Sequence, residues 1–282
     1  MADNTSTPII VKANGDREPF ESGKLLQSLI RSGAAPQVAE RITKRIAGSI
    51  TSGDRTQQIY RRAFTELRAQ KESIGTAARY SVKRALLELG PSGYPFEHFV
   101  GQIFTEMGYT TQTGIQMSGV CVPHEVDVFA EKETETLVGE AKYHNSAGMV
   151  SDVKVALYVD ARFDDIQRKR NGDGDTRRLT KLLITNTKFS GQAVQYGFCR
   201  GLRMISWDYP QEGNLEDLIE QHHVHPISCL ATLSSAQKRR LMDTGVVRCK
   251  QILQEPKMYQ DLNLSSEETG ALHRELQNLC GV

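Results

Sequence analysis

The sequence is poor in the features that mark secreted, membrane-spanning and zinc-binding proteins. No run of apolar residues approaches the ~18 that a membrane-spanning helix needs, and the first ten residues, MADNTSTPII, lack a basic region followed by an apolar core. We therefore expect a frayed tail over residues 1–8 rather than a signal peptide. The five cysteines are widely separated, without a CxxC pair: Cys121, Cys199, Cys229, Cys249 and Cys280. Their scatter argues against a zinc ribbon and a disulfide framework, and favours a cytoplasmic location.

The chain also lacks a strong net charge, although its basic residues gather locally. With a net charge of +1 over 282 residues, binding to nucleic acid must come from patches rather than from a global field. One such patch lies between residues 162 and 188, where eight Lys and Arg residues accompany four Asp residues. The 39% of hydrophobic and 24% of charged residues are ordinary for a folded protein, and the length suits two or three domains.

The pattern of the first ninety residues predicts a β-hairpin followed by four helices. Two short strands flank the Asn-Gly turn signal of residues 14–15. Ser22 and Thr56 are expected to be the N-caps of the first and third helices. The expected strands cover residues 9–12 and 17–20, and the helices begin near residue 23, run over 36–50, begin at 56, and run over 73–89. A Gly-Pro pair at residues 90–91 ends the fourth helix and starts a linker. These features alone also suit a helical bundle with solvated lysines.

The order of residues in this region is more specific. The run IIVKANGDREPFESGKLLQSLIRSGA, with the later TQQIYRRAFTEL and AARYSVKRAL, resembles the ATP-cone, a regulatory nucleotide-binding domain of many ribonucleotide reductases. The likeness covers about residues 8–90. It implies that ATP or dATP binds to the hairpin and to the helices that follow, through Val11, Lys12, Glu18, Lys24, Thr56 and Arg84.

Three positions depart from the usual ATP-cone pattern. The family usually has Arg where this chain has Ala13, Asp where it has Asn14, and in some members His where it has Tyr60. An absent Arg removes a charge-assisted phosphate contact of ~1.5–3 kcal/mol. No GxxxxGK[ST] motif is present, so nothing indicates hydrolysis of the nucleotide by a P-loop.

Two short strands at residues 126–130 and 137–142 carry the residues best suited to chemistry. Glu140 and Lys142 are two apart on one strand, so their side chains leave the same face. Asp127 lies on the neighbouring strand and reaches that face if the register allows. Two carboxylates and an ammonium group at one place suit a divalent metal ion and a phosphate ester. The surrounding pattern predicts helices and strands in the order αβββαβαβ, a mixed sheet flanked by helices. The expected elements cover residues 94–107, 109–116, 126–130, 137–142, 151–163, 179–185, 191–200 and 202–207, followed by a helix over 215–221.

This order, with a carboxylate in the first turn of the helix, then HEVDVFA and GEAKYH, resembles the PD-(D/E)xK nucleases, and among them the Mrr-like restriction endonucleases. The likeness covers about residues 94–210. It implies that Asp127 and Glu140, with the carbonyl group of Ala141, bind Mg²⁺ or Mn²⁺, since Mg²⁺ prefers oxygen ligands and keeps several waters. Lys142 is then the motif lysine, and Glu97 is a helix carboxylate near the same metal. Two alternatives remain: polar residues that decorate a hairpin, and a nuclease fold that binds DNA without cutting it.

Basic residues after the motif are candidates for contact with DNA. His144 follows the motif strand, and Arg162 lies on the next expected helix. The run from Arg168, Lys169 and Arg170 to Asp175 has the composition of a mobile, glycine-rich loop that could follow DNA phosphates. Ordinary solvated loop residues are the alternative.

Residues 226–282 predict a small helical region. Histidines at 222, 223 and 225 with a Cys at 229 match no common zinc spacing. Helices are expected over residues 234–243 and from about 248 to 253, around a Gly-containing turn. With their basic side chains these two weakly resemble a helix-hairpin-helix that binds a DNA backbone, and a helical cap or oligomer contact fits equally well. The candidate DNA contacts here are Lys238, Arg239 and Arg240. Ser265 caps a last helix over 265–279, with Glu268 three residues on.

Taken together, the sequence predicts an α/β multidomain protein. Its expected parts are a tail (1–8), a hairpin-plus-helix ATP-cone (9–90), a restriction-endonuclease-like domain with an αβββαβ mixed sheet (94–222) and a helical C-terminal region (226–282). The expected function is a metal-dependent DNA endonuclease, active in restriction or defence against foreign DNA. Adenine nucleotide would control it by shifting an oligomeric equilibrium of a dimer or tetramer. A non-catalytic, nucleotide-responsive DNA-binding regulator and a nuclease for RNA or branched DNA are the alternatives.

Overall fold

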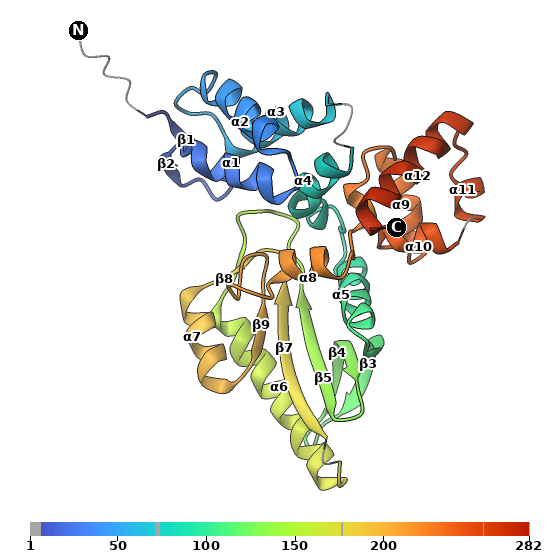
Figure 1. Ribbon diagram of the computed structural model, residues 1–282. Coiled ribbons are helices and arrows are strands. Elements are labelled where there is room, and N and C mark those ends of the chain that lie inside the picture. Colours follow the sequence, from blue (N-terminus) through green and yellow to red (C-terminus); the bar gives the residue numbers. More distant parts are fainter. Residues whose placement is uncertain (1–6, 71–73, 176, 256, 282) are drawn as a thin grey trace.

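The N-terminal part is a small β-hairpin packed on a group of helices (Figure 1). In the computed structural model, which describes residues 7–70, 74–175, 177–255 and 257–281, strands β1 and β2 pair antiparallel around the predicted turn. The chain before α3 holds this hairpin from the side, because Val11 N–H donates to Asp54 O at 2.9 Å. The elements are β1 (Ile9–Val11), β2 (Arg17–Pro19), α1 (Ser22–Arg31), α2 (Pro36–Ala47), α3 (Thr56–Arg68) and α4 (Ile74–Leu86). The predicted tail lies largely outside the described residues, as does the predicted start of the fourth helix.

Both predicted N-caps in this part are wrong by one residue. Glu21 caps α1 and Arg55 caps α3, so Ser22 and Thr56 are the first helical residues. At Arg55 the reason is tertiary, since this residue forms a parallel β-bridge with Val11 and is held extended. The helix over residues 36–50 is also shorter than predicted, because α2 ends at Ala47.

The middle of the chain forms a mixed five-stranded sheet, as predicted. Its order is β3-β4-β5-β7-β9; β3, β4 and β5 are antiparallel, and β5, β7 and β9 are parallel. A two-stranded sheet, β6 with β8, was not predicted. The elements are α5 (Tyr94–Glu106), β3 (Thr110–Ser118), β4 (Pro123–Glu131), β5 (Glu135–Lys142), β6 (Val150–Ser151), α6 (Val153–Gly172), β7 (Arg178–Thr185), β8 (Lys188–Phe189), α7 (Gly191–Arg200), β9 (Arg203–Ile205) and α8 (Leu215–Gln221).

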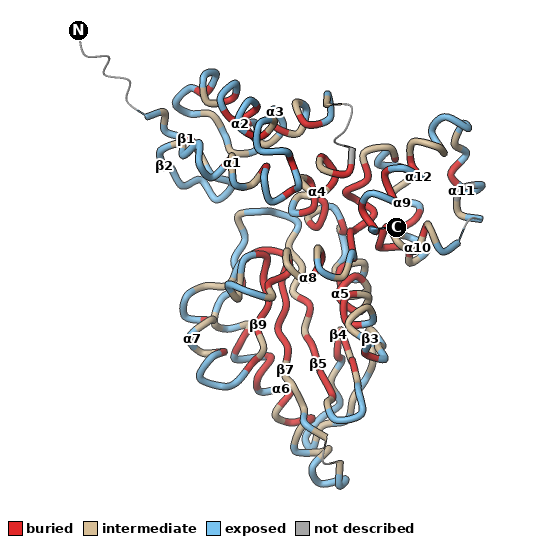
Figure 2. Tube along the Cα trace, in the orientation of Figure 1, coloured by how far each residue is buried: buried red, intermediate tan, exposed pale blue. Residues whose placement is uncertain are grey.

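Helices cover both faces of this sheet, which is why its strands are buried along much of their length (Figure 2). Side chains alternate across the sheet. On β7, Leu182 and Ile184 join the hydrophobic cluster of α5, whereas Leu183 between them joins the cluster of α6 and α7. Helix α6 covers residues 153–172 rather than the predicted 151–163, so it ends nine residues later, and its last turns replace the expected mobile loop.

The C-terminal part is a compact group of short helices: the 3₁₀ turn η1 (Ile227–Cys229), α9 (Ser235–Asp243), α10 (Cys249–Gln254), α11 (Lys257–Asp261) and α12 (Ser266–Cys280). Ser265 caps α12 in a capping box with Glu268, as predicted. This part is tied to the sheet domain because Glu106, at the end of α5, accepts from both Arg248 and Lys250.

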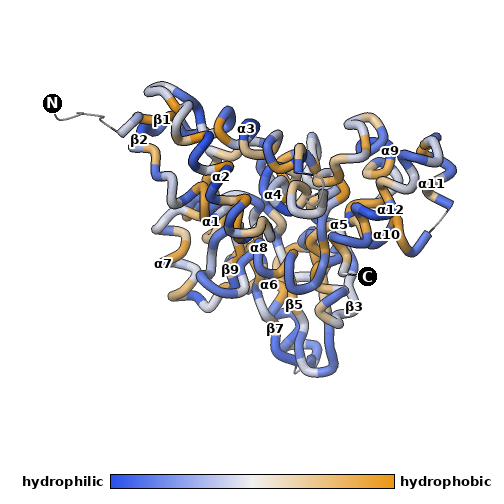
Figure 3. Tube along the Cα trace, turned by 45° about the horizontal axis from the view of Figure 1, so that its top comes forward, coloured by the Kyte–Doolittle hydropathy of each residue, from blue (hydrophilic) through white to orange (hydrophobic). Residues whose placement is uncertain are grey.

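Helix α4 joins the parts of the molecule. Its Ala77 belongs to the hydrophobic cluster of the N-terminal helices, and Ala78, Val82 and Leu86 belong to the large cluster shared with α5, the sheet and the C-terminal helices. Hydrophobic segments accordingly gather around α4, α5 and α8, and hydrophilic ones follow the outer loops (Figure 3). Among the described residues no helix is both long and apolar enough to cross a membrane.

Candidate functional site

The register of β4 and β5 brings Asp127 and Glu140 together. Val128 pairs with Gly139 in the antiparallel ladder, so one step further along Asp127 lies opposite Glu140, with Cβ atoms about 5 Å apart. The N–H of Ala141 donates to Asp127 Oδ2 at 2.8 Å and fixes the orientation of that carboxylate. The condition that the sequence left open, that the register should allow Asp127 to reach the Glu140 face, is met.

Two further carboxylates share the electrostatic environment of this pair. Burial, then repulsion from Asp127, Glu125 and Glu140, raises the pKa of Glu97 to about 7. Burial and the neighbouring Glu140 likewise raise the pKa of Asp127 to about 6. Crowded carboxylates that resist ionisation are a feature of sites that accept a cation or do acid–base chemistry. Glu125 was not singled out from the sequence, where it is only the neighbour-but-one of Asp127.

Arg162 is the internal counter-ion of Glu140. It reaches from α6 to place Nη1 2.6 Å from Glu140 Oε2, and the two side chains are only 11% and 15% exposed. The same guanidinium group donates to the backbone carbonyl of Glu125 and packs on the ring of Tyr158. Arg162 therefore lies at the candidate site, where it contacts one of the two expected metal ligands; its predicted contact with DNA stays a prediction.

The donor set leaves room for a divalent cation. Within the described residues, no hydrogen bond occupies Asp127 Oδ1 or Glu140 Oε1, and Lys142 has neither a hydrogen bond nor an ion pair. No three His, Cys, Asp or Glu side chains of the described chain form a ready-made metal cage. A magnesium ion needs none, because two carboxylates, a carbonyl group and waters complete its octahedron. These residues fit such an ion.

The backbone directly after Lys142 is held by a buried amide. Asn186 Oδ1 accepts from the N–H of His144 at 2.9 Å, and its Nδ2 donates to the carbonyl of His144 at 2.7 Å. The ring of His144 bonds to Ser151 Oγ at 3.0 Å. Burial and the charge of Lys142 both lower the pKa of His144. Asn186 was missed because it is 44 residues from Lys142 in the sequence and lies beside it only through the parallel pairing of β5 with β7.

The predicted basic loop is instead the end of a helix with paired side chains. Arg168 bonds to Asp165 at 3.1 Å and Lys169 to Asp173 at 2.6 Å. Arg170 bonds to Asp175 and to Thr136, and is only 12% exposed. These contacts fix the three residues in place, so the expectation of a mobile, phosphate-tracking loop is wrong. Contact of Arg168 and Lys169 with DNA stays a prediction.

The residues expected to bind a nucleotide lie on the hairpin and on α1, α3 and α4. Lys12 pairs with Glu18 across the hairpin at 2.7 Å, and Lys24 pairs with Glu21 at 2.7 Å. Val11 bridges to the residue before Thr56, which brings the start of α3 beside the hairpin. Arg84 lies over the ring of Tyr60 and pairs with Glu88 at 3.3 Å. A nucleotide-binding role for these residues stays a prediction.

In the C-terminal part the candidate DNA contacts separate into two groups. Lys238 donates to the carbonyl of Ser228 at 2.9 Å and is partly buried. Arg239 and Arg240 are exposed on α9. Arg248 and Lys250, the basic residues around the start of α10, bind Glu106 and so help to dock this part rather than present charge to a ligand.

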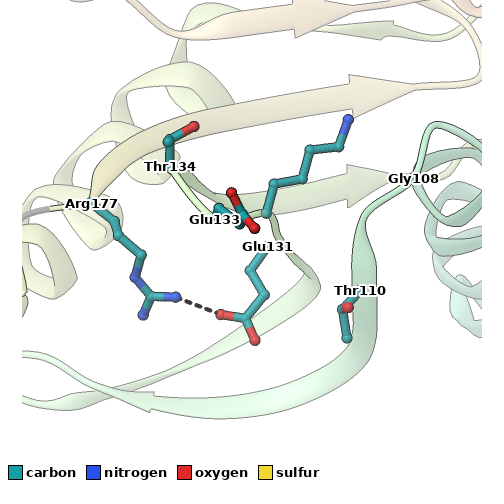
Figure 4. Close-up of a pocket in the computed structure, with 7 residues that line it drawn as sticks. Gly108, Thr110, Glu131, Glu133, Thr134 and Arg177 are labelled. Atoms are coloured by element: carbon teal, nitrogen blue, oxygen red, sulfur yellow. Dashed lines mark hydrogen bonds and ion pairs between the residues drawn. The ribbon is translucent and has the colours of Figure 1, made fainter.

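A separate open pocket lies at the far end of the sheet (Figure 4). It is formed by the β4–β5 turn, Gly108, Thr110 and Arg177, whose Nη1 is 2.8 Å from Glu131 Oε2. Glu135, the first residue of β5 after this turn, is seven positions from Lys142, a distance of about 23 Å along the strand. This pocket contains none of the residues expected to take part in chemistry.

Comparisons with known proteins identify relatives without an established activity. The family model described as AF1548-like, C-terminal, matches residues 225–280. An uncharacterized protein of Archaeoglobus fulgidus is 30% identical over 184 residues, which are 64% of this chain and 100% of that protein. The crystal structure of AF1548, a protein of unknown function, has a TM-score of 0.54 at 28% identity and covers 67% of this chain and 99% of its own.

A complex of the MspJI restriction endonuclease with a 27-mer oligonucleotide has a TM-score of 0.30 at 13% identity, over 67% of this chain and 44% of that one. A score of this size does not establish a common fold, and nothing about this chain follows from it.

Proposed function

The chain belongs to the AF1548-like family, and we propose that it is a metal-dependent endonuclease that hydrolyses phosphodiester bonds of DNA under the control of an adenine nucleotide. The observation that carries the proposal is that Asp127 and Glu140 lie opposite one another on β4 and β5. Lys142, two residues further along β5, has no partner in the part of the chain that the structure describes. Two carboxylates for a metal ion and one ammonium group for a phosphate are the minimal equipment for this hydrolysis.

In this proposal, Asp127 and Glu140 bind Mg²⁺ or Mn²⁺ together with the carbonyl oxygen of Ala141. Such an ion, when bound, supplies a water of lowered pKa and neutralises charge on the phosphate. The hydrogen bond from Ala141 N–H holds Asp127 in position for this. The net reaction adds water to phosphorus and breaks one phosphorus–oxygen ester bond.

The other side chains have roles that follow from their surroundings. Lys142 donates to a phosphate oxygen and orients the attacking water, because it has no partner among the described residues that would compete. Glu97, with a pKa of about 7, is a proton acceptor or donor close to neutral pH. Arg162 neutralises Glu140 when the site holds no cation, and turns towards the phosphate when a cation takes its place.

Nucleotide control is proposed for the hairpin. ATP or dATP binds at Val11, Lys12, Glu18 and Lys24, with Thr56 and Arg84 completing the site. Lys12 is about half exposed and can exchange Glu18 for a phosphate. The nucleotide acts by favouring one of two states of the protein, since a ligand alters a distant site only through a difference in affinity. We propose further that these states differ in oligomerisation, as dimer or tetramer.

Contact with DNA beyond the cleavage site is proposed for His144, for the exposed Arg168 and the partly exposed Lys169 at the end of α6, and for Arg239 and Arg240 on α9. These side chains add affinity that falls with salt but carry no sequence information. The cytoplasm, where foreign DNA is met, is the proposed location.

A second candidate function is a DNA-binding regulator that responds to nucleotide without cutting. The ion pair of Arg162 with Glu140 favours it, because a permanent pair would make a divalent cation unnecessary. RNA or branched DNA as the substrate is a third possibility.

The test is a cleavage assay on plasmid, linear duplex, branched DNA and RNA, with Mg²⁺ or Mn²⁺ and with or without ATP or dATP. Wild type is compared with Glu140→Ala and Lys142→Ala, and with Lys132→Ala as the matched control on the β4–β5 turn. Cleavage by wild type and the control, but not by the two site variants, supports the proposal. DNA binding without cleavage under every condition would leave only the regulator.

A further inference from the structure

We infer that the β1–β2 hairpin regulates the candidate nuclease site through the segment of residues 143–149, called here the linking loop. This inference rests on the proposed function, because it concerns control of the same site. The linking loop starts directly after Lys142 and rises from the end of β5 towards the N-terminal part (Figure 1). Three contacts hold it in place. In two of them the partner residue belongs to the N-terminal part.

The first contact joins the hairpin turn to the end of the linking loop. A Cβ atom added to Gly148 would lie 2.9 Å from both Cα and N of Asn14, and 3.1 Å from C of Ala13. These are backbone atoms, so a side chain at position 148 cannot be accommodated by a rotamer change. The backbone of the hairpin turn therefore lies directly on the backbone of the linking loop, an approach that only glycine permits.

The second contact joins the end of α4 to the beginning of the linking loop. Tyr143 Oη donates to the carbonyl of Leu87, just beyond α4, at 2.6 Å. The ring of Tyr143 fills the space beside Gly90, where a Cβ would lie 2.6 Å from Oη. The third contact is the amide of Asn186, which holds His144 and also donates to the carbonyl of Leu86 at 3.4 Å.

The hairpin turn that touches Gly148 is part of the proposed nucleotide site. Lys12 N–H donates to Asp16 O at 2.8 Å, and Gly15 N–H donates to Lys12 O at 3.0 Å, so Lys12 is built into the turn. Its side chain pairs with Glu18 at 2.7 Å. A phosphate that draws Lys12 away from Glu18 changes the hairpin one residue from its contact with the linking loop. Movement there is transmitted along the linking loop to the backbone of Lys142, six residues before Gly148.

The test uses Gly148→Ala in the full chain, with Gly191→Ala as the matched control. A Cβ at Gly191 would meet nothing within 4 Å, and neither residue is proposed to touch substrate. The expected result is that the cleavage rate of Gly148→Ala is the same with and without ATP or dATP to within about twofold, whereas that of wild type changes. The variant should also lose the effect of DNA on nucleotide affinity, because coupling between two binding sites is reciprocal. Gly191→Ala keeps both.

A second measurement separates failure of this inference from failure of the proposed function. Hydrogen exchange of the backbone amides is followed with and without ATP, in wild type, Gly148→Ala and Tyr143→Phe, which removes the bond to Leu87. Changes that spread from the hairpin to residues 143–149 in wild type, and stay on the hairpin in Gly148→Ala, support the inference even if no nucleic acid is cut. The inference would be overturned if ATP changed the hydrogen exchange of Gly148→Ala as it does that of wild type. It would also be overturned if ATP bound to wild type without changing exchange in the linking loop, or if no nucleotide bound at all.

Discussion

Replacing Asp127 with Asn should stabilise the metal-free protein at alkaline pH. The structure holds this carboxylate beside Glu140 and largely out of water, and raises its pKa from the ordinary 3.8 to about 6. Such a rise corresponds to about 3 kcal/mol against the ionised form, since a tenfold change in an equilibrium is worth about 1.4 kcal/mol. Residual solvation of the half-buried side chain reduces the expected gain to about 1–2 kcal/mol. The amide oxygen of Asn still accepts from Ala141, so the geometry survives.

The sign of the pH dependence follows from the raised pKa. A carboxyl group that binds its proton more tightly in the folded state stabilises that state below the unfolded pKa, and this contribution is lost as the pH rises through the folded pKa. The advantage of Asp127→Asn should therefore be absent near pH 3.8, grow up to about pH 6, and stay constant above it.

The assay is thermal unfolding with chelator at a series of pH values, and a gain of 1–2 kcal/mol is about 2–6 °C at pH 8. Glu133→Gln, an exposed position on the β4–β5 turn, is the control and should change little. Saturating Mn²⁺ should reverse the order, because it stabilises wild type but not the variant. The reasoning would be refuted if the variant were less stable than wild type at pH 8 with chelator. It would also be refuted if the gain in stability were the same at every pH.

Two further predictions concern ion pairs. Arg162→Met should lower the free energy of unfolding by about 3 kcal/mol with chelator, since it leaves Glu140 without a counter-ion. With saturating Mn²⁺ the loss should be clearly smaller. Urea unfolding measures both losses, and equal values would show that Arg162 and the cation do not share Glu140. Glu106→Gln should lower the free energy of unfolding by about 2–3 kcal/mol, because the buried Arg248 and the neighbouring Lys250 lose their common acceptor. It should also make the C-terminal helices more susceptible to limited proteolysis. Unchanged proteolysis would mean that this pair does not dock them.

The sequence predicted those elements whose signals are local. Helices α7 and α8 have the predicted bounds because Ser190 and Asn214 cap them with their own side chains. The expected mixed sheet follows from the alternation of helices and short apolar strands. The sequence indicated that Asp127 and Glu140 could face one another, since this required only one register of the hairpin formed by β4 and β5.

Elements governed by distant contacts were predicted less well. Thr56 is not a cap because a bridge to the hairpin extends the chain through Arg55. The end of α6 has the composition of a loop, yet pairs such as Lys169 with Asp173, four apart, support a helix. The contact of Gly148 with the hairpin turn joins residues more than 130 positions apart. No local sequence pattern predicts such a contact. A glycine that is required because another backbone segment packs against it looks the same in the sequence as any other glycine.

The central claim is that Asp127 and Glu140 bind the cation on which cleavage depends. It is tested most directly by the rate of DNA cleavage as a function of Mn²⁺ concentration for wild type, Glu140→Gln and Glu131→Gln, the last a carboxylate on the same sheet but at its far end. The account predicts that wild type and Glu131→Gln respond to Mn²⁺ alike, and that Glu140→Gln does not cleave at any concentration. Cleavage by Glu140→Gln with the rate and Mn²⁺ dependence of wild type would contradict it.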